Sequence, residues 1–223
     1  MQVRGFTELW VRSDMTSDFW AERDEDIISW LLTRRSVRQF LKNPVPAEAI
    51  EQLLRAAIQA PSAHNRQPAR FMVIQKPEVK LRLAEAMGAD FLRDLLQDGV
   101  PLASAKAQVE RSRQRITEAP LDILVCLEIE SLDNYPDQKR QQAEYIMAVQ
   151  GVAMAAENLL LAAHCLRLGA VWLCAPLFAP ETVRRTLCLP DSWEPQGLIL
   201  SGYPAITPEG RSRRPLAELT RYD

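Results

Sequence analysis

The segment 145–166 constrains the fold most, because it is an apolar run long enough to cross a membrane. Four polar side chains interrupt it, and such groups are costly inside a bilayer: Gln150, Glu157, Asn158 and His164. The pattern therefore favours one long helix over 138–168 that is buried in a protein core. Gly169 is the natural stop for this helix, because glycine readily takes the left-handed conformation of a helix end. We expect no contact with a membrane.

Short apolar runs alternate with helical segments along the rest of the chain. Strands are predicted at 70–75, 121–129, 170–174 and 196–202. Helices are predicted at 26–35 and 47–59, after Pro77, over most of 89–118 with a break at GVP, and after Pro180. This irregular alternation predicts an α/β or α+β fold of two or three layers, between which composition does not choose.

The 223 residues contain no repeat and no obvious linker, so we expect one main domain over 25–223. Residues 1–24 are rich in aromatic side chains and are expected to form an N-terminal arm that packs against a protein surface. The formal net charge of −2 argues against nucleic-acid binding, which requires a basic surface.

The four cysteines, Cys126, Cys165, Cys174 and Cys188, form no CxxC pair and mostly lie in apolar runs. They are predicted to be buried free thiols in a reducing compartment. The first ten residues lack a long apolar stretch, so no signal peptide is expected and a cytoplasmic location follows. Two histidines are too few for a typical zinc site, so we predict no metal.

The stretch TRRSVRQF, residues 33–40, concentrates positive charge in a mildly acidic chain. Arg34, Arg35, Ser36 and Arg38 have the donors that suit phosphate oxygens. Cations near a helix C-terminus also offset the helix dipole, so a solvated basic turn is the alternative. A second basic cluster in the tail contains Arg211, Arg213 and Arg214, and the two clusters either meet on one phosphate or stay apart in solvent.

The loop PSAHNRQP holds Ser62, Asn65 and Gln67 between two prolines, which restrict its freedom. Amide side chains suit a flat heterocycle with carbonyls and ring nitrogens, although an ordinary polar turn has the same composition. His64 is a candidate ligand contact in this loop, and Cys174 lies at the end of a predicted strand. No base is identifiable beside Cys174, so no catalytic side chain is predicted. The chain has no dinucleotide-binding fingerprint and no P-loop.

Taken together, these motifs resemble those of the nitroreductase family of FMN-dependent oxidoreductases. The resemblance rests on DIISWLLTRRSVRQF, APSAHNRQP, AAENLLLAAHCLRLGAVWLC, ILSGYP and the RSRRPLAEL tail, in that order, over about residues 24–220. It implies an α+β sandwich with a central, mostly antiparallel sheet flanked by helices. It also implies an interlocked homodimer with two FMN sites, each built from both chains.

The resemblance also implies roles for particular residues. Arg34, Arg35, Ser36 and Arg38, with Arg211 or Arg213, would hold the phosphate and ribityl chain of FMN. Pro61, Ser62 and Asn65 of the second chain would line the flavin ring, and Cys174 and Ala175 would approach it. Electrons would pass from NADH, NADPH or a reduced deazaflavin through FMN to a small conjugated acceptor, and the protein would supply binding and electrostatics.

The acceptor has several candidates. QPARF, NYPD and DSWEPQG resemble the C-terminal reductase domain of the bifunctional enzyme of deazaflavin-coenzyme biosynthesis, which implies a dehydro-deazaflavin precursor as substrate. The alternatives are a general nitro or quinone reductase, the family branch that makes the lower ligand of vitamin B12, and a non-catalytic FMN or deazaflavin binding protein. Arg70, with Lys106, Arg111, Arg113 and Arg115, is a candidate for binding an acidic substrate, although 106–115 also has the pattern of a solvated helix face.

Overall fold

The computed structural model describes residues 26–223, which fall into two units divided between Arg34 and Arg35. The described part of the first unit is a helix over 26–33. The predicted arm 1–24 lies outside the described residues. All elements below belong to the second unit.

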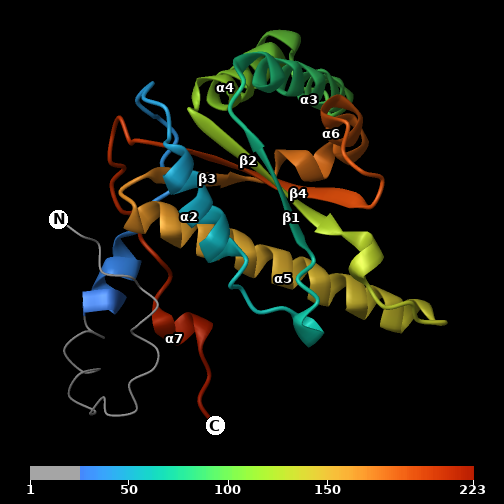
Figure 1. Ribbon diagram of the computed structural model, residues 1–223. Coiled ribbons are helices and arrows are strands. Elements are labelled where there is room, and N and C mark those ends of the chain that lie inside the picture. Colours follow the sequence, from blue (N-terminus) through green and yellow to red (C-terminus); the bar gives the residue numbers. More distant parts are fainter. Residues whose placement is uncertain (1–25) are drawn as a thin grey trace. The chain divides into compact units, whose positions relative to one another are not determined.

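A four-stranded antiparallel sheet forms the centre of the second unit (Figure 1). Its strands are β1 (Ala69–Ile74), β2 (Leu121–Glu128), β3 (Gly169–Leu173) and β4 (Trp193–Gly202). They lie in the order β1-β2-β4-β3, so β1 and β3 are the two edges. The predicted α+β class and antiparallel sheet are confirmed, and each predicted strand lies within a few residues of an observed one.

Helices cover both faces of this sheet (Figure 1). The helices are α2 (Ala47–Ala57), α3 (Pro77–Gln97), α4 (Leu102–Glu118), α5 (Gln138–Cys165), α6 (Pro180–Leu187) and α7 (Leu216–Leu219). Short 3₁₀ turns lie at η2 (Ala63–Asn65), η3 (Ile129–Ser131) and η4 (Ala175–Phe178). Alternate residues of β2 point to opposite faces, so Ile123 packs with α2 and α5 while Leu124 packs with α3 and α6.

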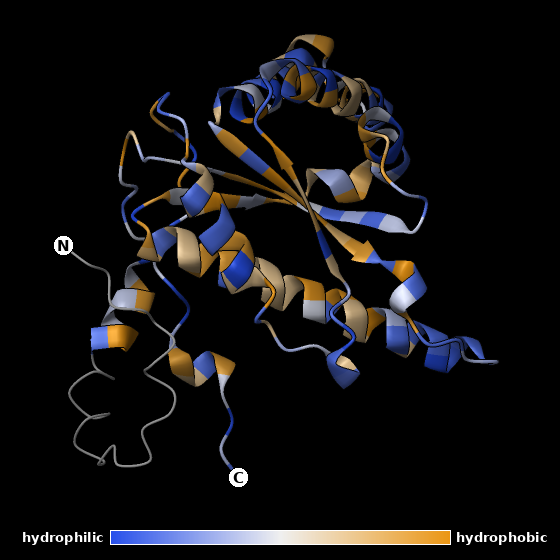
Figure 2. Ribbon diagram, viewed as in Figure 1, coloured by the Kyte–Doolittle hydropathy of each residue, from blue (hydrophilic) through white to orange (hydrophobic). Residues whose placement is uncertain are grey.

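Helix α5 is the predicted long apolar helix, and most of its length is hydrophobic (Figure 2). By length and composition alone it could cross a membrane. Its buried residues include Val152, Ala156 and Leu159, which pack against the sheet in the same core cluster as Ile199. The core accordingly explains the apolar character of the face that carries these residues.

The end of α5 differs from the prediction. The helix stops at Cys165, and the left-handed residue behind it is Arg167, with φ = 60°, in place of Gly169. The amide of Leu168 donates to the carbonyl of Ala163 at 2.8 Å, which is the bonding pattern of a Schellman helix end. Gly169 has another role, because a Cβ atom there would lie 2.6 Å from the side chain of Val37.

The cysteines are free thiols as predicted, but the expectation that they are buried is wrong for three of the four. Cys126 is buried in β2, whereas Cys165, Cys174 and Cys188 are exposed, each at the end of a helix or strand. The apolar neighbours of these cysteines in the sequence were misleading. At the end of a helix or strand the chain leaves the core, so a side chain there is exposed even when the preceding residues are buried.

Cys126 should resist alkylation in the folded protein. Burial raises the pKa of its thiol to about 12, so the reactive thiolate is scarce at neutral pH. We expect iodoacetamide at pH 8 to leave Cys126 unmodified in native protein and to modify it in urea, as read by mass spectrometry of peptides. Rapid native modification at a rate equal to that in urea would contradict the burial.

One ion pair lies inside the core between α3 and the sheet. Lys80 and Asp122 have side chains that are 3% and 0% exposed, with Nζ 3.7 Å from Oδ1. Lys80 also donates to the carbonyl of Ala119. Burial lowers the pKa of Lys80 and raises the pKa of Asp122 well above its usual value, while the attraction between the two opposes both shifts.

Candidate functional site

The basic stretch after the first helix is fixed along the outer edge of β3. Ser36 forms a parallel bridge with Ala170, and the amide of Val37 donates to the Ala170 carbonyl at 3.0 Å. Further along, the amide of Leu41 donates to the Tyr203 carbonyl at 2.8 Å. Main-chain bonds on both sides therefore hold this segment to the sheet.

The two basic clusters approach each other at this edge. A Cβ atom on Gly210 would lie 2.9 Å from Nη2 of Arg35, so the Arg35 guanidinium lies directly against the tail. Arg211 is the next residue, and both Arg211 and Arg213 are exposed. Arg38 donates from Nη1 to the Ser36 carbonyl at 3.3 Å. Arg34 is the last residue of the first unit.

The polar loop between the two prolines has an unusual backbone. His64, Asn65 and Gln67 have φ of 53°, 54° and 52°, a region that residues other than glycine seldom enter. Ser62 holds this conformation, since its Oγ accepts from the Gln67 amide at 2.9 Å and its carbonyl accepts from the Asn65 amide at 3.0 Å. Such conformations cost energy and are characteristic of ligand-binding segments.

The loop rests on α5 at Gly151. A Cβ atom on Gly151 would lie 3.4 Å from Cβ of Ser62, which is ordinary contact. A cavity of about 430 Å³ opens beside the loop, and its lining includes Ser62, Gln67, Arg70 and Gly151. Pro61, His64 and Asn65 are not among its lining residues. His64 and Asn65 are exposed at the tip of the loop.

Arg70, the candidate substrate residue, is engaged by its own chain. Its Nη1 donates to the carbonyls of Gln67 at 2.9 Å and Ala69 at 3.0 Å. Its Nε lies 3.5 Å from Oε2 of Glu128. The guanidinium thus supports the loop from behind while it lines the cavity.

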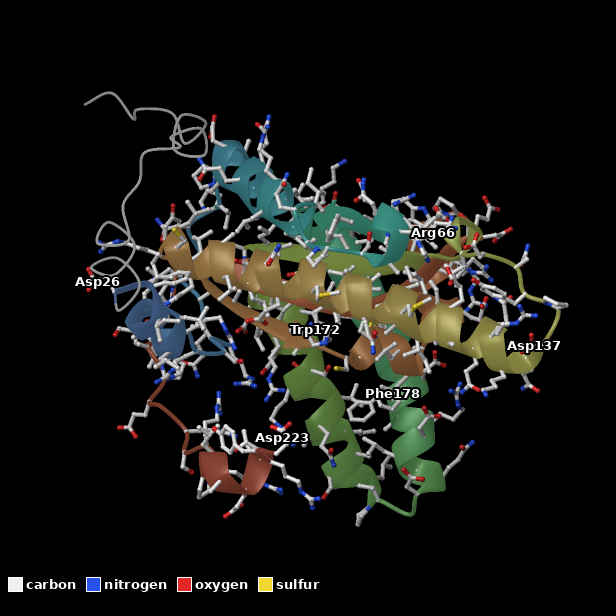
Figure 3. The ribbon with its side chains drawn as sticks, turned by 90° about the horizontal axis from the view of Figure 1, so that it is seen from below. Asp26, Arg66, Asp137, Trp172, Phe178 and Asp223 are labelled. Atoms are coloured by element: carbon white, nitrogen blue, oxygen red, sulfur yellow. The ribbon has the colours of Figure 1, made fainter. Side chains whose placement is uncertain are left out.

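A larger cavity of about 630 Å³ lies at the end of β3, between η4 and the α3–α4 hairpin. Cys174 and Ala175, which the resemblance would place against the flavin ring, line this cavity. Its apolar wall contains Met87, Phe91, Leu95, Trp172, Leu173 and Phe178. Figure 3 shows Phe178 beside α3 and α4. This volume and lining are typical of cofactor and small-molecule sites.

Trp172 is fixed at this cavity by two contacts that sequence reasoning missed. A Cβ atom on Gly197 would lie 2.1 Å from Cζ2 of Trp172, so the indole lies directly on the glycine of the neighbouring strand. The indole Nε1 donates to Sγ of Cys174 at 3.1 Å. The signal available in the sequence was a lone glycine inside the last strand, which marks a close approach of another group.

Gly197→Ala should displace this indole. Because the added methyl has no room beneath the ring, we expect a loss of about 1–3 kcal/mol in the free energy of unfolding. Urea titration followed by circular dichroism measures this. Gly151→Ala is the control, since its methyl meets only ordinary contacts and should be neutral or stabilising. Equal stability of the two variants would contradict the packing.

The candidate residues separate into two sets on opposite edges of the sheet. The basic stretch and the larger cavity lie along β3. Ser36 stands beside Ala170, and Cys174 is four residues further along, roughly 13 Å away. The polar loop precedes β1, which is the opposite edge strand, three positions from β3 in the sheet. One chain therefore does not bring the loop to the basic stretch.

Comparison with known proteins identifies the family. Residues 31–203 match the sequence pattern of the Nitroreductase family. This chain belongs to the nitroreductase family. A protein of Methanothermobacter thermautotrophicus, named for NADH dehydrogenase and NAD(P)H nitroreductase activity, is 31% identical over 188 residues, covering 83% of this chain and 81% of that one. The NADH dehydrogenase of Thermus thermophilus is 30% identical over 216 residues, covering 86% and 93%.

Solved nitroreductase structures share the fold. The FMN complex of a nitroreductase-like protein from Desulfovibrio desulfuricans is 30% identical, with a TM-score of 0.67 over 88% of this chain and 96% of that chain. The NADPH:FMN oxidoreductase of Vibrio harveyi is 19% identical, with a TM-score of 0.66 over 88% and 76%, and supports the fold alone. This nitroreductase-family chain is an FMN-dependent oxidoreductase.

The residues present fit the cofactor. Arg35, Ser36 and Arg38 offer charged and hydroxyl donors for a phosphate at one end of β3. The apolar cavity at the other end has the size for a flat ring. Sequence reasoning missed Phe91, Trp172 and Phe178 in the cavity wall, because their meeting depends on how the α3–α4 hairpin packs.

Proposed function

We propose that this chain binds the FMN phosphate with Arg35, Ser36, Arg38 and the tail arginines Arg211 and Arg213, together with Arg34. The flavin ring would occupy the larger cavity beside Cys174 and Ala175. The observation that supports this arrangement is that the basic stretch and the larger cavity lie at the two ends of the same strand, β3. The basic stretch runs beside the outer edge of β3, and the end of this strand opens into an apolar cavity.

We further propose a homodimer in which the loop residues Pro61, Ser62 and Asn65 of the second subunit complete each site. The support is that one chain places its loop and its basic stretch on opposite sheet edges. A two-fold axis would bring the loop of each chain to the basic edge of the other. The strained loop backbone would then contact the ring edge through main-chain groups, and Asn65 through its amide.

Two inactive variants should complement each other in such a dimer. One carries Arg35→Glu and Arg38→Glu, and the other carries Ser62→Tyr and Asn65→Ala. Random mixing after partial unfolding makes half of the dimers mixed, each with one intact site, so roughly a quarter of wild-type activity should return. Sites contained in single chains would give no recovery, and that result would refute the shared site.

The reaction we propose is NAD(P)H-dependent reduction of a small conjugated acceptor. Bound FMN would supply the redox chemistry, which is the acceptance and donation of a hydride equivalent. The protein's part is to bind, to orient and to exclude water. The main-chain bonds of the basic stretch hold the donors for the phosphate in place, and the Trp172–Gly197 contact fixes the shape of the cavity. No side chain is needed as a nucleophile.

The decisive measurement is the flavin absorption of the FMN-loaded protein before and after anaerobic NADH or NADPH. We expect the flavin band to bleach and to return when a nitroaromatic or quinone is added. A band that persists with both donors would refute NAD(P)H-dependent turnover and favour a flavin carrier. A dehydro-deazaflavin precursor belongs in the same acceptor panel, on the resemblance of QPARF and DSWEPQG, and its preference over quinones would assign that role.

A further inference from the structure

Two of the three aspartates that line the larger cavity, Asp90 and Asp94, are already engaged by Arg93. Asp90 accepts from Thr182 Oγ1 at 2.5 Å and from Arg93 Nη1 at 2.6 Å, which lowers its pKa and keeps it ionised. Arg93 Nη2 also lies 3.0 Å from Asp94. Both carboxylates on α3 are therefore held by Arg93 and not by the arginines of α4.

Two arginines on the opposite wall are different. Arg111 and Arg115 are one turn apart on α4, and both line the cavity. Neither makes an ion pair or a hydrogen bond with any residue of the described range 26–223. Arg113, between them, is turned away and binds Glu110 through two hydrogen bonds of 2.8 and 2.6 Å.

The remaining aspartate of the lining, Asp98, lies too far along the hairpin to satisfy them. A Cβ atom on Gly88 would lie 3.1 Å from Val109, which sets the level at which α3 and α4 pack. Because α3 and α4 are antiparallel, Asp98 lies on the loop side of the Gly88–Val109 contact and Arg111 lies on the other side. The two residues are thus separated by a helix length of about 12 residues, or roughly 18 Å. The cavity lining thus has two arginines without an ion pair in the described range, next to aromatic side chains.

We propose that Arg111 and Arg115 form an anion subsite that selects acceptors with a carboxylate, sulfonate or phosphate on a flat conjugated body. Guanidinium forks match such oxyanions with paired hydrogen bonds. The apolar wall, with Phe91, Trp172 and Phe178, takes the conjugated part. This inference rests on the proposed function, because it assigns the acceptor class of the same site.

The test compares two acceptors of equal size, para-nitrobenzoate and para-nitrobenzamide, with the FMN-loaded protein and NADH or NADPH. We expect wild type to prefer the carboxylate in kcat/KM. Arg111→Gln/Arg115→Gln should lower kcat/KM for para-nitrobenzoate by about 10- to 100-fold and leave para-nitrobenzamide within about 2-fold. Arg113→Gln is the matched control on the same helix and should change neither.

Binding gives a readout independent of turnover. Isothermal titration of oxidised, FMN-loaded protein with para-nitrobenzoate should show the same loss in the double variant, with FMN content unchanged. Equal affinity in wild type and variant would overturn the subsite. Loss of FMN from the variant would also overturn it, since the arginines would then hold the cofactor. If no acceptor is reduced by any form, the proposed function fails, and the titration still decides the subsite.

Discussion

Replacing Arg35 and Arg38 together with glutamine should raise the dissociation constant of FMN by about 10²- to 10⁴-fold. A hydrogen bond to a charged group is worth about 1.5–3 kcal/mol, and each arginine is expected to make at least one to the phosphate. Glutamine keeps much of the length and polarity of the side chain, so the change isolates the charge. Equilibrium dialysis or quenching of flavin fluorescence measures the constant.

The control for this experiment is Arg55→Gln. Arg55 is an equally charged side chain on α2 that forms an ion pair with Glu51, both well exposed, and such pairs contribute little. We expect FMN affinity to stay within about 2-fold in this variant. An unchanged dissociation constant in the Arg35/Arg38 variant would refute the phosphate assignment. Adding salt should weaken FMN binding to wild type more than to the double variant.

Lys80→Met should lower the free energy of unfolding by about 3–5 kcal/mol, because it leaves the Asp122 carboxylate buried without its cation. Urea titration measures the loss. Lys106→Met is the control, a lysine on an exposed face of α4, and should stay within about 0.5 kcal/mol of wild type. Equal effects of the two changes would show that the buried pair has no special role.

A second substitution should rescue the first. Leucine has the shape of aspartate without its charge, so Lys80→Met/Asp122→Leu removes the unpaired carboxylate and should recover most of the lost stability. The Ala119 carbonyl still loses its donor, so a deficit of about 1 kcal/mol is expected. A double variant as unstable as Lys80→Met alone would contradict this reasoning.

The cost of Lys80→Met should also depend on pH. The pKa of Asp122 is raised in the folded protein by burial, and removal of Lys80 raises it further. A carboxyl group with a raised folded pKa contributes stability that is present below its unfolded pKa and lost as pH rises through the folded value. The variant should therefore be closer to wild type at pH 5 than at pH 8, and the opposite trend would contradict the assignment.

Most elements of the fold were predictable, because each depends on a local pattern. The long helix, the buried strand β2 and the break between α3 and α4 follow from apolar runs and from a Gly–Pro pair. The end of α5 was not predictable, because Arg167 takes the left-handed position and Gly169 instead packs closely against Val37. That contact depends on a segment more than a hundred residues earlier in the chain.

The candidate site was predictable in its parts and not in its assembly. The arginine-rich stretch, the polar loop and the strand end were visible in the sequence. The order of the strands in the sheet was not visible in the sequence. This order puts Ser36 and Cys174 on one edge and the loop before β1 on the other. The direction of Arg111 and Arg115, against that of Arg113, likewise depends on how the α3–α4 hairpin turns toward β3.

The separation of the loop from the basic stretch makes cofactor loading and subunit association a single linked equilibrium in the proposed dimer. A ligand that binds only the assembled form stabilises it by mass action, and assembly raises the affinity for the ligand by the same factor. Dilution would then release flavin even at constant FMN, and flavin depletion would free subunits. The quantity of active enzyme would rise more steeply than the quantity of chain, because each functional unit consumes two polypeptides.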